Sequence, residues 1–207
     1  MKYEIHRAED FSEVKNLPRV EMNIHHGHYK WEDPEKYTNP DVRAWAQVGW
    51  NDEAFLVCLT AKEKEIRAVG TDPLYSTCDD SCLEFFLSPM TGDLRYFNIE
   101  FNPLGCFFLG FGENVETLVR LIPEEEDLLR AKPVITEDGW QISYTVPFSF
   151  IRHFFPEFKP EKGYCCKGNF YKCGDKTVIP HFYAWSPIER EKLTFHSPEC
   201  FGDFELV

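Results

Sequence analysis

The sequence lacks any apolar run long enough to cross a bilayer, and its opening, MKYEIHRAEDFSEV, lacks the apolar centre of a secretory signal peptide. It also contains no internal repeat, no low-complexity linker and no shift in composition. These absences favour a single domain over residues 1–207 that is not inserted in a membrane. Localisation stays open, because a chain whose signal peptide had been removed would look the same.

Basic residues are in deficit, with 22 Lys and Arg against 35 Asp and Glu and a formal charge of −13. The basic residues of one segment, Lys62, Lys64 and Arg67, are interleaved with Glu63 and Glu65, so no local basic patch forms. A phosphate backbone or an anionic membrane surface would be repelled by this charge. We therefore expect neither nucleic acid nor a membrane as a partner.

The eight cysteines lack the repeated close pairs of a zinc module and the density of a disulfide scaffold. Cys58 and Cys106 lie inside apolar runs, as small buried hydrophobic residues do. Free thiols in a reducing compartment are the prediction. A ligand set of Cys165, Cys166 and Cys173 with His181 is disfavoured, because neighbouring cysteines rarely bind one metal ion.

Short segments rich in β-forming residues fill most of the chain, and turn signals such as Asn51-Asp52 and Asp138-Gly139 separate them. With hydrophobic residues at 43% and aromatic residues at 16%, a substantial core is expected. The pattern predicts an all-β fold, a single antiparallel β-sandwich or jelly roll. Strands are expected at 44–50, 54–61, 81–88, 94–101, 105–112, 117–122, 133–136, 140–147 and 203–207, with short helices at 124–130 and 148–155.

Two neighbouring segments, 81–88 and 94–101, alternate most clearly. Since side chains alternate across a pleated strand, each segment has an apolar face and a polar face. If residues 89–93 close a hairpin, the polar side chains gather on one face of the sheet. The expected core residues are Leu83, Phe85, Phe97 and Ile99, and the polar face carries Glu84, Asn98 and Glu100 with Asn102 at its end. Periodicity alone favours an ordinary solvated face.

The ordered series WNDEAFLVCLTAKE, DDSCLEFFLSP, YFNIEFNPLG, GWQISYTVPFSFI, GNFYKCGDK, HFYAWSP and FHSPECFGDFELV resembles the family 9 carbohydrate-binding modules and the family 9-like proteins of that group. The likeness extends from about residue 43 to the C-terminus. It implies a β-sandwich that holds a sugar or the end of a glycan between two aromatic rings. It also implies a role in carbohydrate catabolism, in which glycoside hydrolases are the expected protein partners.

The same resemblance implies particular ligand-binding residues. One ring matches Trp185 in HFYAWSP, and the second matches Tyr75 in DPLYSTCDDS, where the family has Trp. The acidic residue of the family strand matches Glu84, and the polar pair of the next strand matches Asn98 and Glu100, where the family has Arg and Asn. Aromatic rings suit the faces of a pyranose, and carboxylates and amides suit its hydroxyls. Without the resemblance, a terminal Trp is more often a core residue.

Three alternatives remain open at the level of sequence. Glu84 and Glu100 on adjacent strands are the pair that a glycoside hydrolase or lyase would use. A DOMON-type module that binds haem or another protein has the same architecture. To hold haem it would need axial Met or His, and the chain has only Met1, Met22 and Met90 as methionines. A loop cluster, His25, His26 and His28, has metal-binding chemistry but is more often solvated.

No cofactor is expected to be required, but structural calcium is compatible with the chain. The hard oxygen donors Asp52, Glu53, Asp79 and Asp80 lie near predicted strand ends. They show no regular ligand spacing of the EF-hand kind. No metal ligands are therefore assigned, and the chain is expected to be a binding protein rather than an enzyme.

Overall fold

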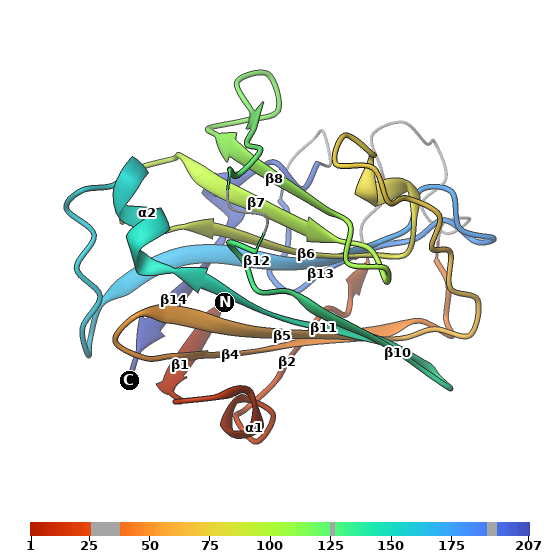
Figure 1. The fold of residues 1–207 in the computed structure, drawn as a ribbon, viewed down its shortest axis with the longest axis horizontal. Coiled ribbons are helices and arrows are strands. Elements are labelled where there is room, and N and C mark those ends of the chain that lie inside the picture. Colours follow the sequence, from red (N-terminus) through yellow and green to blue (C-terminus); the bar gives the residue numbers. More distant parts are fainter. Residues whose placement is uncertain (26–37, 125–126, 190–193) are drawn as a thin grey trace.

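The computed structural model describes residues 1–25, 38–124, 127–189 and 194–207. Two curved layers of strands pack face to face, and the helices lie at the margins (Figure 1). Sheet A, the upper layer of Figure 1, contains β3 (Ile24–His25), β6 (Cys82–Ser88), β7 (Tyr96–Phe101), β8 (Phe107–Gly112), β9 (Val119–Arg120), β12 (Cys165–Cys173), β13 (Phe182–Ala184) and β14 (Gly202–Leu206). Sheet B contains β2 (Val20–Glu21), β4 (Arg43–Trp50), β5 (Ala54–Lys62), β10 (Lys132–Thr136) and β11 (Gly139–Pro147).

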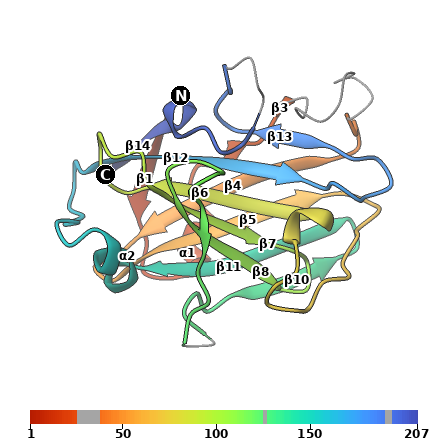
Figure 2. The same cartoon turned by 90° about the horizontal axis from the view of Figure 1, so that it is seen from above.

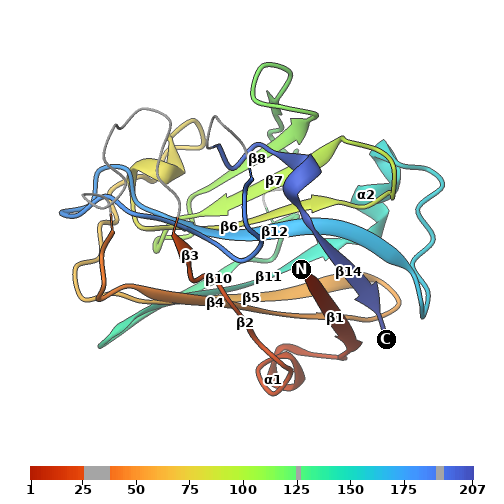
Figure 3. The same cartoon turned by 180° about the vertical axis from the view of Figure 1, so that it is seen from behind.

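Strand β1, Lys2–Arg7, joins the two sheets at one corner of the sandwich. Its first half pairs with β14 of sheet A and its second half with β4 of sheet B, and both pairings are parallel. Figure 3 shows β1 beside β14, with the N- and C-termini close together. The prediction of a purely antiparallel sandwich is therefore wrong at this corner, although the β-sandwich itself is confirmed.

The predicted β6–β7 hairpin forms, and its register places Phe85 opposite Ile99 and Leu87 opposite Phe97. These apolar side chains face sheet B, and the predicted core residue Leu83 joins them; all are fully buried. Burial of each side chain stabilises the fold by about 1.5–3 kcal/mol. The alternation of residues 81–88 and 94–101 thus identified the core face correctly.

Helices are few and short. The helix α2, Phe148–Phe154, confirms the predicted helix at 148–155, and its Phe148 and Phe154 pack on Phe55 of sheet B and Phe97 of sheet A. The predicted helix at 124–130 is wrong where the chain is described, since 127–129 form a turn. The helix α1, Phe11–Val14, was not predicted. It begins at Asp10, whose carboxylate accepts hydrogen bonds from the amides of residues 12 and 13.

The core also contains a buried ion pair between Lys172 of β12 and Glu63, with Nζ and Oε1 3.2 Å apart. Glu63 accepts further hydrogen bonds from the Trp140 indole at 2.6 Å and the Ser81 hydroxyl at 3.0 Å. Lys172 donates to His181 Nε2 at 2.9 Å. Such pairs are tolerated in a core only when their hydrogen bonds are satisfied in this way.

All eight cysteines are free, as predicted. Cys165 is exposed and Cys166 is buried, because neighbouring strand residues point to opposite faces. These two residues therefore do not join Cys173 in one ligand set. Among the described residues, no helix has the length and apolar character needed to cross a membrane.

Candidate functional site

Polar side chains from β6 and β7 gather on the outer face of sheet A. Glu84 lies directly opposite Glu100 in the antiparallel register, and Asn98 points to the same face two residues before Glu100. We call Glu84, Asn98 and Glu100 the polar patch. The structure confirms that these three predicted residues lie together on the face away from the core.

The polar patch is covered rather than solvated. Glu84 is 3% exposed, Asn98 0% and Glu100 9%. The turn η2, Thr77–Asp79, lies over β6 and β7 (Figure 2), and the Thr77 hydroxyl donates a hydrogen bond to Glu100 at 2.6 Å. The alternative of an ordinary solvated face is therefore wrong.

Residues 194–201, which include the short helix η3 (Pro198–Cys200), also cover this face. They are held by two phenolic hydroxyls of the sheet. The Tyr171 hydroxyl donates to the Phe195 carbonyl at 3.0 Å, and the Tyr96 hydroxyl lies 2.7 Å from His196 Nδ1. Burial lowers the pKa of His196 to about 4, so the ring is neutral at pH 7.

The polar patch is not fully satisfied by the protein itself. Asn98 Nδ2 donates to Glu100 Oε1 at 2.9 Å, and the Cys173 thiol donates to Glu84 Oε1 at 3.0 Å. Asn98 Oδ1 is buried and has no hydrogen-bond partner among the residues that the structure describes. A buried acceptor left unpaired costs about 1–3 kcal/mol, so a ligand that donates a hydrogen bond here would recover that free energy.

Two buried carboxyl groups face each other in the patch. Burial and then the facing Glu100 carboxylate raise the pKa of Glu84 well above its ordinary value. Burial also raises the pKa of Glu100, although hydrogen bonds from Thr77 and Asn98 oppose that shift. Within the described ranges, neither carboxylate forms an ion pair with Lys or Arg. The patch can therefore accept hydrogen bonds from hydroxyls or bind a cation.

Aromatic rings adjoin the polar patch, and sequence reasoning missed the two most prominent ones. Tyr171 of β12 is the cross-strand partner of Glu84, and Phe195 stacks on it with ring centroids 4.0 Å apart and planes 11° apart. The alternation of residues 165–173 was the available signal. This alternation is hard to recognise in the sequence, because one of the core-facing positions is the charged residue Lys172.

Trp185 does not lie at the polar patch. Its indole is 3% exposed and packs in the core on Tyr3, Phe170 and Phe204, stacked on the last at 5.4 Å. The expected partial exposure is wrong, because the segment after β13 turns the ring inward between the sheets. A ring enclosed on three sides by aromatic side chains has no free face for a sugar.

Tyr75 lies outside the sandwich, on the loop that leads into η2, and is half-buried. Its ring lies against Gly70, where a Cβ atom would meet the ring at 1.9 Å, and its hydroxyl donates to Asp80 at 3.1 Å. One face of the ring is thus covered. Trp185 and Tyr75 do not form a pair of facing rings, since one is in the core and the other on the covering loop.

Asn102 has a structural role. Its Nδ2 donates to the Gly70 carbonyl at 2.8 Å and to Asp80 at 2.9 Å, and its Oδ1 accepts the amides of Leu104 and Cys106, each at 3.0 Å. An Asn side chain offers two donors and two acceptor positions, and all are used here. We therefore leave Asn102 out of the proposed site.

The remaining predicted metal donors do not converge. Asp79 binds Lys176 and Asp52 binds Arg7, each at 2.7 Å, and Asp80 accepts the amides of residues 69 and 70. His26 and His28 lie outside the described residues, and the structure does not describe the side chain of His25. Structural calcium stays a prediction.

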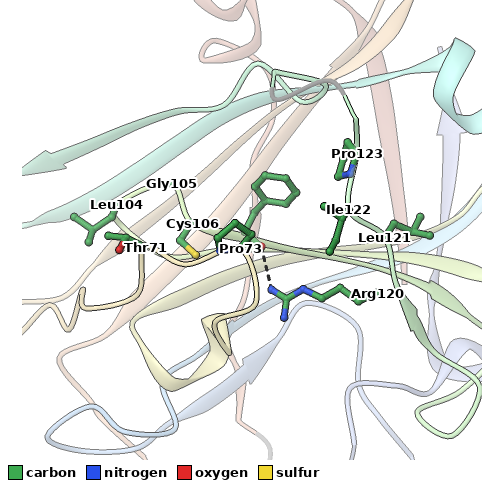
Figure 4. A pocket seen from close by; sticks show the side chains of 10 residues that line it. Thr71, Pro73, Leu104, Gly105, Cys106, Arg120, Leu121, Ile122 and Pro123 are labelled. Carbon is green, nitrogen blue, oxygen red and sulfur yellow. Dashed lines mark hydrogen bonds between the residues drawn. The ribbon is translucent and has the colours of Figure 1, made fainter.

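A pocket of about 280 Å³ lies at the β8–β9 end of sheet A (Figure 4). Its walls are mainly apolar, and its charged member, Arg120, lies 4.7 Å over the Phe108 ring. The guanidinium donates to the carbonyls of Leu74 at 3.0 Å and Tyr75 at 2.9 Å. The lining residues are Thr71, Pro73, Leu104, Gly105, Cys106, Phe107, Arg120, Leu121, Ile122 and Pro123. With no carboxylate or side-chain amide among them, this pocket suits a polyhydroxylated ligand less well than the polar patch.

A sequence model described as "Carbohydrate-binding family 9" matches residues 23–206. The fold is similar to the crystal structure of a proposed carbohydrate-binding protein from Bacteroides uniformis, which is 23% identical with a TM-score of 0.81 and covers 100% of this chain and 99% of its own. No curated protein matches the chain in sequence.

The fold is also similar to a family 9 carbohydrate-binding module from Caldicellulosiruptor kristjanssonii. Its complex with glucose is 11% identical with a TM-score of 0.69, covering 100% of this chain and 96% of that one. Its complex with cellotriose is 11% identical with a TM-score of 0.68, covering 100% and 93%. At these identities the likeness concerns the fold.

Proposed function

This chain belongs to carbohydrate-binding family 9, and we propose that it binds a small sugar or the end of a glycan on the outer face of sheet A without catalysing a reaction. The family is one of binding modules, and a module of the same fold has been solved with glucose and with cellotriose. These likenesses support the class of ligand. Its identity, a role in carbohydrate catabolism and glycoside hydrolase partners stay predictions.

The observation that carries the proposal is Asn98 Oδ1, which has no hydrogen-bond partner among the described residues and lies beside the facing Glu84 and Glu100. A sugar hydroxyl both donates and accepts, so one hydroxyl can donate to Asn98 while neighbouring hydroxyls donate to Glu84 and Glu100. A sugar reaches these groups only when η2 or residues 194–201 move aside, because both segments cover the patch. In so shielded a place, each hydrogen bond discriminates strongly against a ligand that leaves a group unpaired. The patch therefore supplies the polar rim contacts.

The apolar faces of the sugar need rings, and the two covering segments supply them. Tyr75 precedes η2, and Phe195 is the second residue of the segment 194–201; both are half-buried. We assign them as the rings against which the sugar packs. Phe195 takes the place that the sequence resemblance gave to Trp185, and Tyr75 keeps its predicted role.

Catalysis by Glu84 and Glu100 is the second candidate, favoured by their direct cross-strand pairing. A glycoside hydrolase needs one carboxylate ionised and the other protonated. Here burial raises the pKa of both carboxyl groups, so these shifts do not make one group the acid and the other the ionised carboxylate. We assign the pair to binding, and sugar release from a panel of oligosaccharides that is lost in Glu84→Gln would contradict this assignment.

Calorimetric titration with glucose, cellotriose and a panel of other mono- and oligosaccharides tests the proposal. Glu84→Gln and Asn98→Ala should each weaken binding by about 10-fold, because each change leaves a buried hydrogen bond of the complex unmade, at a cost of about 1–3 kcal/mol. Glu4→Gln is the matched control, since Glu4 is an exposed carboxylate on β1. Its affinity should equal that of the wild type.

Two results would contradict the proposal. One is the absence of binding across the panel by a correctly folded wild type. The other is binding that persists unchanged in both patch variants, which would move the site elsewhere, with the pocket beside Arg120 as the next place to examine.

A further inference from the structure

Two thiols and a carboxylate meet at one end of the polar patch, on the β6–β12 strand pair. Cys82 and Cys173 are direct cross-strand partners, and Glu84 follows Cys82 by two residues on the same face. Their sulfur and carboxylate oxygen atoms all lie within 4.8 Å of one another. Cys82 is 0% exposed, Cys173 1% and Glu84 3%.

We propose that Cys82, Cys173 and Glu84 bind a thiophilic divalent cation of the Zn²⁺ class. A tetrahedral zinc ion, with bonds of about 2.3 Å to sulfur and about 2.1 Å to oxygen, holds its ligand atoms roughly 3.6–3.8 Å apart. The Cys173 sulfur already lies 3.0 Å from Glu84 Oε1. Small side-chain rotations therefore suffice to reach ligand geometry, and the paired strands hold the three Cα positions in place.

Charge gives a second and independent reason to expect a cation. The Glu84 and Glu100 carboxylates are directly opposed and buried, with no Lys or Arg ion pair in the described parts of the chain. The Lys172 ammonium lies on the core side of β12, where it is bound to Glu63. A divalent ion at Glu84 would offset the repulsion between the carboxylates.

The donor set selects the kind of ion. Calcium and magnesium prefer oxygen ligands throughout, whereas two thiolates with one carboxylate favour zinc and similar soft ions. Three protein ligands leave one coordination position for water or another donor. The proposed ion thus differs from the structural calcium with which the sequence is compatible, and it uses none of Asp52, Glu53, Asp79 and Asp80.

Binding must remove two thiol protons. Burial raises the pKa of Cys82 to about 12 and raises the pKa of Cys173 well above its ordinary value, so both thiols are neutral without an ion. On binding, the two S–H bonds break, two metal–sulfur bonds form and the protons pass to the solvent. The hydrogen bond from Cys173 to Glu84 is then replaced by their shared coordination of the ion.

Cobalt titration of the full chain tests the proposal. The protein is kept reduced, freed of metal with a chelator and studied without sugar, so failure here would leave the proposed function untouched. One equivalent of Co²⁺ should produce thiolate-to-cobalt charge-transfer absorption in the near ultraviolet and the visible bands of a four-coordinate ion. Zn²⁺ should then remove both signals by displacing the cobalt.

Variants locate the ligands. Cys82→Ser and Cys173→Ser should each lower the charge-transfer intensity per bound ion by about half and weaken binding by at least about 10-fold. Glu84→Gln should retain that intensity per bound ion but bind more weakly. Cys58→Ser is the matched control, since Cys58 is a buried free thiol on sheet B, and it should titrate like the wild type.

The proposal is overturned if the reduced wild type shows no charge-transfer band, or if the band is unchanged in both serine variants. Circular dichroism of the metal-free variants checks that they fold. Should a serine variant not fold, Glu84→Gln decides: a cobalt affinity equal to that of the wild type overturns the proposed ligand set, and a weaker one supports it.

Discussion

Removing the Trp185 indole is expected to destabilise the fold while leaving sugar affinity intact in a variant that stays folded. The ring is enclosed by Tyr3, Phe170 and Phe204, with centroid distances of 6.3, 5.9 and 5.4 Å. It belongs to the core cluster between the two sheets. A buried ring of this size contributes through the area that it removes from water and through its edge-to-face and stacked contacts.

The magnitude follows from that burial. A Trp side chain buries up to about 250 Å², which at about 25 cal/mol per Å² corresponds to roughly 6 kcal/mol. The alanine that replaces the indole still contributes part of this burial free energy, and core Trp→Ala changes typically cost about 3–5 kcal/mol of stability. For a chain of this length, each kcal/mol lowers Tm by about 2–4 °C, so Trp185→Ala should melt roughly 6–20 °C below the wild type. Trp185→Phe keeps a ring on Phe204 and should lose less.

The assay combines thermal unfolding with sugar titration of Trp185→Phe, which is expected to stay folded. The matched comparison is Phe195→Ala, which removes a half-buried ring beside the polar patch. Phe195→Ala should weaken sugar binding and change Tm little. Trp185→Phe should lower Tm and leave the sugar affinity unchanged. If Trp185→Phe lost affinity by about 10-fold or more at an unchanged Tm, the indole would be a ligand ring and the reasoning would be refuted.

Two further predictions concern the buried polar groups. Lys172→Met leaves the Glu63 carboxylate buried without its cation, so the free energy of unfolding in denaturant should fall by about 3–5 kcal/mol. Adding Glu63→Gln should restore part of this stability. If the losses of the two single variants simply added in the double variant, the coupling would be contradicted. The second prediction concerns His196, whose pKa is about 4 in the folded protein and about 6.5 in the unfolded chain. As the pH drops from about 6.5 to 4, the unfolded state binds a proton that the folded state does not, so the free energy of unfolding falls. His196→Asn keeps an acceptor for the Tyr96 hydroxyl but has no ring to protonate. Over that pH interval, its free energy of unfolding should fall by up to about 3 kcal/mol less than that of the wild type. If the free energy of unfolding fell equally with pH in both proteins, the assignment would be refuted.

Local pattern was sufficient for much of the fold. Alternation in residues 81–88 and 94–101 depends only on the geometry of a pleated strand, so the hairpin, its core face and the shared face of Glu84, Asn98 and Glu100 were predictable. The strands β1, β2, β3, β12 and β13 were missed. The short ones are stabilised by pairing with distant segments more than by their own sequence. In β12, the buried Lys172 on the core face obscured the alternation. The parallel pairing of β1 has no local signature, since its partners β14 and β4 lie far away in the chain.

The candidate site was likewise predictable only where local sequence pattern is sufficient. Residue type and strand period determined which side chains share the outer face of sheet A, and the ordered motifs determined the family. Only the tertiary structure decided that this face is covered by η2 and residues 194–201, that Trp185 turns into the core, and that Cys82 and Cys173 meet beside Glu84. Burial and the meeting of distant strands depend on how the whole chain packs, and no local period encodes them.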